Sequence, residues 1–195
     1  PRSRGLGDVY KRQHQDHRTL EEYARFRDEA SAKGIRHFLE VFNPKTQVVT
    51  PGADFGSYNN DAVVRCLAAV SKHDRPLFLK AAYNGPAATE EIASYDPENL
   101  IFGILGGGAG TTRDCLELIR QAEKYGARVA LFGRKIYYAE DSVTMLMAMR
   151  RTTEEKLESV EATKAYHADL QKLGISPFRE LNADLELTEE VLKAG

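Results

Sequence analysis

The sequence has few cysteines and little net charge, and each shortage excludes a class of protein. Only two of the 195 residues are cysteine, Cys66 and Cys115, so we expect a reduced, cytoplasmic setting rather than a disulfide framework. Lysine and arginine number 27 against 29 acidic residues, which gives a formal net charge of −2. This balance favours neither nucleic acid nor an anionic membrane as a partner.

Long apolar runs and grouped histidines are also missing. No apolar run approaches the roughly 20 residues that a membrane-spanning helix needs. The five histidines are scattered, without His-x-x-x-His or Glu-x-x-His spacing, so the sequence predicts no metal site. Hydrophobic residues make up 42% and charged residues 29%, which is typical of a globular domain with a core of its own.

Residues 1–13 (PRSRGLGDVYKRQ) differ from the rest of the chain. They contain neither an initiator methionine nor the apolar segment of a signal peptide. The string resembles translated sequencing-adapter sequence, so we expect a non-native leader and leave it out of the fold prediction. The alternative is a native basic loop. On either interpretation we expect the reading frame to begin inside a longer protein.

Between residues 18 and 152, short apolar segments with strand character alternate with amphipathic helical segments. This order predicts a parallel sheet covered by helices, and right-handed crossovers leave either a barrel or an open doubly wound sheet. Four strand–helix units are half of a (β/α)8 barrel of about 250 residues. We therefore predict an α/β fold, the C-terminal half of a TIM barrel, followed by a charged helical tail over residues 153–195. The predicted strands cover residues 36–42, 76–83, 100–105 and 128–132, and the predicted helices cover residues 18–33, 62–72, 86–94, 111–125, 141–150, 153–173 and 188–193.

Lys80 lies near the carboxyl end of the apolar segment LFLKAAY (residues 77–83). Because side chains alternate faces along a strand, Lys80 shares a face with Phe78 and Ala82. Desolvation among such neighbours disfavours the charged ammonium and frees the amine as a nucleophile for imine formation. The alternatives are a lysine that reaches solvent from a strand end, or one that pairs with a carboxylate such as Glu40.

Tyr83 ends the same segment, three residues after Lys80. Its phenol is a candidate donor or acceptor for the proton of a hydroxyl group that is made or cleaved. The alternative is a tyrosine that only packs at the mouth of the sheet.

Residues 106–110 (GGGAG) form a glycine-rich loop before a helical segment that opens with Thr111 and Thr112. Glycines let backbone N–H groups approach an anion, and a helix N-terminus adds a favourable dipole. The loop lacks the lysine of a Walker A motif and the spacing of a dinucleotide-binding motif. We favour anion binding over a flexible turn, because three consecutive glycines cost conformational entropy.

Gly133 and Arg134 follow the next apolar segment, one strand–helix unit later. Two successive loops with glycine, the second carrying an arginine, match the phosphate site of a barrel after its seventh and eighth strands. The guanidinium of Arg134 can bind phosphate through two parallel hydrogen bonds.

Over residues 36–151 the chain resembles the class I, Schiff-base-forming aldolases of the DhnA, DeoC and LacD type. LFLKAAY is similar to the sixth strand of that family, and the resemblance implies that Lys80 forms the imine. LIFGILGGGAG (residues 100–110) is similar to the seventh strand and its phosphate-binding loop. The phosphate-binding glycines implied here are Gly106, Gly107 and Gly108.

The segment ALFGRKIYYAEDSVTM (residues 130–145) resembles the eighth-strand motif of the same family, which implies that Gly133 and Arg134 bind phosphate. The family usually has asparagine where Lys135 stands. The segment for the fifth strand, RHFLEVF, offers Glu40 where some members carry aromatic acid/base residues. The tail after residue 153 has no counterpart in this resemblance.

The resemblance implies a lyase that cleaves or forms a carbon–carbon bond in a phosphorylated sugar, without a cofactor. Lys80 forms the imine, and Tyr83 or Glu40 moves protons. Half a barrel exposes two sheet edges, so we expect a homo-oligomer, and a chain that is inactive by itself. Two alternatives stay open: a phosphosugar isomerase or epimerase in which Lys80 is only electrostatic, and a catalytically silent phosphosugar-binding barrel protein.

Overall fold

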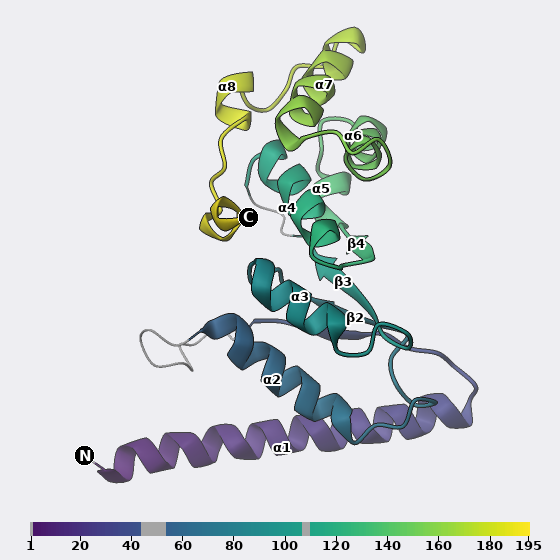
Figure 1. Cartoon of the computed structure of the whole chain (residues 1–195), viewed down its shortest axis with the longest axis vertical. Coiled ribbons are helices and arrows are strands. Elements are labelled where there is room, and N and C mark those ends of the chain that lie inside the picture. The colour runs from purple at the N-terminus through teal and green to yellow at the C-terminus, as the bar shows by residue number, and fades with distance from the viewer. Residues whose placement is uncertain (1, 44–53, 107–109) are drawn as a thin grey trace.

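The computed structural model describes residues 2–43, 54–106 and 110–195, and a parallel sheet of four strands lies at its centre (Figure 1). The strands pair in the order β1-β2-β3-β4, which is also their order along the chain. A chain that steps to the next strand through right-handed crossovers keeps its connecting helices on one face. This α/β arrangement is compatible with half of a barrel. The strands are β1 (Leu39–Val41), β2 (Phe78–Ala81), β3 (Ile101–Leu105) and β4 (Val129–Leu131).

Helices precede, separate and follow the strands, as the alternation in the sequence predicts. They are α1 (Arg2–Ala32), α2 (Phe55–Ala68), α3 (Pro86–Ser94), α4 (Thr112–Lys124), α5 (Arg134–Tyr137), α6 (Ser142–Glu154), α7 (Ser159–Lys172), α8 (Leu181–Asp184) and the 3-10 helix η1 (Glu190–Ala194).

Several helices begin away from the predicted residues. α1 begins at Arg2 rather than at residue 18, so most of the segment that we left out of the prediction is helical. α2 begins at Phe55 rather than at residue 62, because the side chain of Asp54 accepts a hydrogen bond from the Gly56 N–H at 2.9 Å. The single turn of α5, which begins at Arg134, was not predicted.

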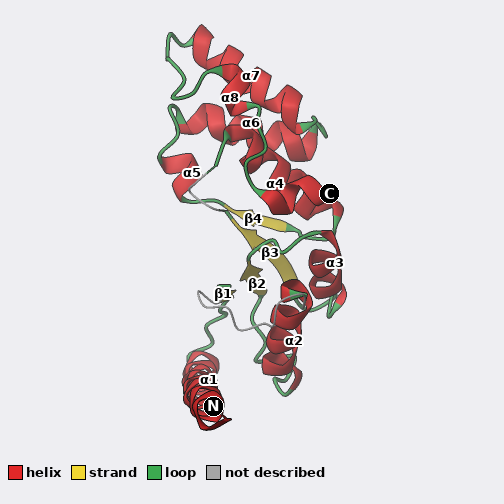
Figure 2. Ribbon diagram, turned by 90° about the vertical axis from the view of Figure 1, so that its left-hand side faces the viewer, coloured by secondary structure: helices red, strands yellow, loops and turns green. Residues whose placement is uncertain are grey.

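The two faces of the sheet have different surroundings. On one face Leu79 and Ile104 are fully buried in a core that includes Leu67 from α2, and α2 and α3 lie on the same side of the strands (Figure 2). On the other face Phe78 stacks on Phe38 with ring centroids 4.8 Å apart. Phe38 is 52% exposed, so this second face remains partly open to solvent.

The C-terminal tail packs against α4 and α6, two of the helices that lie beside the sheet. α7 contacts α4 and α6, and its Tyr166 and Leu170 are fully buried. Leu192 in η1 joins the same hydrophobic core, and burial of one such leucine contributes about 2 kcal/mol. η1 therefore lies beside α4 (Figure 1).

Candidate functional site

Lys80 and Glu40 lie opposite each other on neighbouring strands. β1 and β2 pair with Glu40 in register with Lys80, and Lys80 Nζ lies 2.8 Å from Glu40 Oε1. Both side chains are partly exposed, at 21% for the lysine and 28% for the glutamate. The structure therefore pairs Lys80 with Glu40, one of the arrangements that the sequence left open. A carboxylate in contact with an amine is also a base that can accept its proton.

The strand on the other side of Lys80 presents a glycine. Gly103 of β3 is in register with Lys80, and a Cβ there would lie 3.1 Å from the carbonyl oxygen and 3.2 Å from the Cβ of Val129. Glycine therefore allows close approach of β3 and β4. The sequence analysis did not single out Gly103, although an isolated glycine inside a strand often marks such an approach.

Tyr83 lies in the core rather than in contact with Lys80. Its side chain is 7% exposed, and its hydroxyl donates a 2.7 Å hydrogen bond to Gln121 Oε1 of α4. Burial raises the pKa of the Tyr83 phenol well above its usual value. This placement supports the packing interpretation of Tyr83.

Gly106 follows β3 at a position where a side chain has no room. A Cβ at Gly106 would lie 2.0 Å from Cδ1 of Phe132, so the aromatic ring that follows β4 requires a glycine at this position. Gly107 and Gly108, which the resemblance assigns to phosphate binding, lie outside the described residues.

The first N–H groups of α4 already have carboxylate partners. The Thr111 N–H donates to Asp114 Oδ2 at 2.8 Å, and the Thr112 N–H donates to Asp184 Oδ1 at 2.7 Å. His167 Nε2 lies 2.9 Å from the other oxygen of Asp184. Burial opposes the ionisation of Asp184, but the hydrogen bonds from Thr112 and His167 outweigh it and lower its pKa. A carboxylate of the tail thus occupies an anion position that the sequence analysis gave to a substrate phosphate.

Arg134 lines a pocket of about 150 Å³ beyond the carboxyl ends of β3 and β4. Gly110 and Thr112 from the start of α4 line it too, as does Lys135. Lys135 Nζ donates hydrogen bonds to the carbonyl oxygens of Gly110 and Thr111, at 3.2 and 3.1 Å, and so ties the two loops together. The sequence analysis noted Lys135 only as a departure from the family, and its position beside Arg134 was the available signal.

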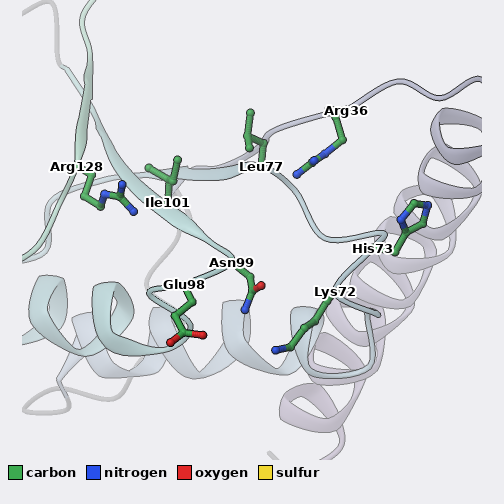
Figure 3. Close-up of a pocket in the computed structure, with 8 residues that line it drawn as sticks. All are labelled: Arg36, Lys72, His73, Leu77, Glu98, Asn99, Ile101 and Arg128. Atoms are coloured by element: carbon green, nitrogen blue, oxygen red, sulfur yellow. The ribbon is translucent and has the colours of Figure 1, made fainter.

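A larger hollow, of about 500 Å³, lies at the opposite ends of the strands. Arg36, Lys72 and Arg128 point toward it, while Leu77 and Ile101 line it where β2 and β3 begin (Figure 3). Binding and catalysis in parallel α/β sheets occur beyond the carboxyl ends of the strands. The pocket at Arg134 is therefore the better candidate for a substrate site.

Some other kinds of site are not found in the described part of the chain. There, no group of three or more histidine, cysteine, aspartate or glutamate side chains is placed to hold a metal ion. Burial raises the pKa of the Cys115 thiol to about 12, so Cys115 is no candidate for a thiolate nucleophile. None of the described helices has both the length and the apolar character needed to cross a bilayer.

Comparison of the chain with protein-family models and with curated proteins gave no match to either. The functional assignment therefore depends on the residues and contacts described above.

Proposed function

We propose that the protein is a class I aldolase-type lyase, which forms or cleaves a carbon–carbon bond in a phosphorylated sugar through an imine on Lys80. The contact between Lys80 and Glu40 on the partly open face of the sheet carries this proposal. A second support is the pocket lined by Arg134 and Lys135, because it lies at the strand ends where parallel sheets bind ligands.

In this proposal the amine of Lys80 attacks the carbonyl carbon of the sugar, and loss of water gives a protonated imine. The imine accepts the electron pair of the carbon–carbon bond as that bond breaks, which leaves an enamine on Lys80 and releases an aldehyde. Glu40 takes the proton of the substrate hydroxyl during cleavage. Protonation of the enamine carbon and hydrolysis of the resulting imine then release the ketone and restore the amine. These steps need no cofactor.

The phosphate of the substrate binds beside Arg134 and Lys135. Arginine suits this role because its planar guanidinium donates two parallel hydrogen bonds to phosphate oxygens. Gly133, in the same loop as Arg134, has open space around its Cβ position, whereas the space at Gly106 is filled by the Phe132 ring. Tyr83 keeps α4 in place through Gln121 and takes no part in proton transfer.

Borohydride trapping tests the proposal. The protein is incubated with dihydroxyacetone phosphate and with small phosphorylated aldehydes, reduced with borohydride, and mapped by mass spectrometry. We expect a covalent adduct on Lys80 in the unaltered protein and no adduct in Lys80→Arg. Because Lys80→Arg keeps the positive charge opposite Glu40, loss of the adduct reports the chemistry of the amine rather than loss of the ion pair.

A phosphosugar isomerase or epimerase is the second candidate, favoured by the 2.8 Å ion pair in which Lys80 acts only as a charge. It predicts a folded, phosphate-binding protein that gives no adduct on Lys80 but converts the substrate. A protein that binds phosphosugar and neither forms an adduct nor converts it would instead be a silent binding module.

A further inference from the structure

Besides the start of α4, two segments distant in the sequence build the pocket at Arg134. One wall comes from the loop after β4, and the other comes from Phe178 and Arg179 in the tail between α7 and α8. The pocket measures about 150 Å³. A water molecule's share of liquid volume is about 30 Å³, so the pocket has room for a group the size of a phosphate.

The charges that line this pocket are mostly positive. Arg134, Lys135 and Arg179 contribute three cations, against one carboxylate, that of Glu140. Both oxygens of Glu140 accept hydrogen bonds from the tail: Oε2 from the Tyr166 hydroxyl at 2.7 Å, and Oε1 from the backbone N–H of Phe178 at 2.8 Å. Glu140 therefore anchors the residue that precedes Arg179.

The guanidinium of Arg179 has N–H donors available for a ligand. Its Nη1 lies 4.0 Å from Asp184 Oδ1, the limit of an ion pair, and its side chain is 48% exposed. Asp184 is held more closely by the Thr112 N–H at 2.7 Å and by His167 at 2.9 Å. A guanidinium carries five N–H donors, and those of Arg179 lie at the rim of a cationic pocket.

The tail is fixed on both sides of Arg179. Phe178 is bonded to Glu140, and beyond Asp184 the carbonyl oxygen of Leu185 accepts a 2.8 Å hydrogen bond from Arg113 Nη1. A side chain on an anchored segment loses less conformational entropy when it binds a ligand. We propose that Arg179 completes a phosphate-binding pocket with Arg134 and Lys135, so that the C-terminal tail is part of the site for a phosphate monoester.

This inference rests on the proposed function for its ligand class, and binding of inorganic phosphate to the folded chain tests it. Arg179→Gln is compared with Arg134→Gln and with Arg150→Gln. Arg150 is a matched control, since its side chain is 55% exposed and pairs with Glu154 on α6. A charge-assisted hydrogen bond to phosphate corresponds to about tenfold to hundredfold in affinity. We expect such a loss in the first two variants, wild-type binding in Arg150→Gln, and partial recovery in Arg179→Lys.

The outcomes separate this inference from the aldolase proposal. If Arg134→Gln loses phosphate binding and Arg179→Gln keeps it, the tail has no role in binding, while the pocket at Arg134 is still supported. A wild-type chain that does not bind phosphate overturns the pocket itself. Loss of binding in both variants, without any adduct on Lys80, supports the phosphate pocket and refutes the aldolase mechanism. If Arg179→Gln unfolds, Arg179→Lys decides, because lysine keeps the charge but lacks the paired N–H donors of the guanidinium. Phosphate binding weaker than in the wild type then supports the role of Arg179, and binding equal to the wild type counts against it.

Discussion

Replacement of Asp114 by asparagine tests how strongly the tail is fastened to the sheet. Asp114 is 3% exposed at the start of α4, where its carboxylate accepts the Thr111 N–H at 2.8 Å. The same carboxylate accepts the Thr188 hydroxyl at 2.6 Å and the Thr188 and Glu189 N–H groups at 2.9 and 3.3 Å. One side chain thus caps α4 and holds the chain between α8 and η1.

The expected cost follows from these contacts. Loss of a helix-capping carboxylate costs about 1 kcal/mol, and hydrogen bonds to a charged group are worth roughly 1.5–3 kcal/mol each when they are lost singly. Asparagine keeps the shape and one acceptor oxygen, but its NH₂ group faces N–H donors. We expect Asp114→Asn to lower the free energy of unfolding by about 3 kcal/mol, which in a domain of this size lowers Tm by about 6–12 °C.

Thermal and urea unfolding followed by circular dichroism measure this loss, with Asp141→Asn as the control. Asp141 caps α6 with its carboxylate, which accepts hydrogen bonds from the N–H and hydroxyl of Thr144 at 2.7 and 2.6 Å. Its replacement is expected to cost about 1 kcal/mol. If Asp114→Asn costs no more than Asp141→Asn, the tail contacts contribute nothing and the reasoning fails.

The pH dependence of stability gives a second measurement of the same contact. Burial opposes ionisation of Asp114, but the hydrogen bonds from Thr188, Thr111 and Glu189 outweigh it, so its pKa lies below the usual value. The pKa of an aspartate in the unfolded chain is about 3.9. A carboxyl whose pKa is lowered in the folded state stabilises the fold at pH values above that. That stabilisation is lost as the pH falls through the lowered folded-state pKa. Asp114→Asn is expected to flatten the acid limb of the stability curve.

Three further substitutions test positions that the sequence analysis assigned to function. Gly106→Ala places a Cβ 2.0 Å from the Phe132 ring, and we expect it to lower the free energy of unfolding, measured in urea, by about 1–3 kcal/mol. Gly133→Ala places a Cβ where nothing lies within 4 Å, so it should leave the packing unchanged. Tyr83→Phe removes the 2.7 Å hydrogen bond to Gln121 and should cost about 1–2 kcal/mol. Trapping of the imine should be unaffected by Tyr83→Phe, and a strong loss of the adduct in a folded variant would return Tyr83 to the proton-transfer role.

The alternation of elements could be predicted from the sequence, since strand and helix periods differ. Each of the four predicted strands has a counterpart in the sheet, and α3 and α4 lie within about a residue of their predicted bounds. The predicted strands were longer than the observed ones, because apolar character continues beyond the residues that pair. Tyr83, for instance, follows β2 and is buried.

The site could be predicted only where a residue's neighbours are close in the sequence or fixed by strand register. Glu40 was named as a possible partner of Lys80, and the pairing of β1 with β2 brings the two into contact. The tail was treated as a charged appendage, since its buried residues are spread among charged ones. No local pattern indicated that Asp184 would reach the first turn of α4.

That long-range contact changes how anion binding at this end of the sheet is understood. A glycine-rich loop before a helix predicts that backbone N–H groups hold the phosphate, yet those of Thr111 and Thr112 are bonded to Asp114 and Asp184. A second anion there would lie beside two carboxylates whose low pKa values keep them ionised at neutral pH. Like charges so close repel each other, so a phosphate is better placed among cationic side chains. The tail thus removes one anion position and, through Arg179, contributes to another.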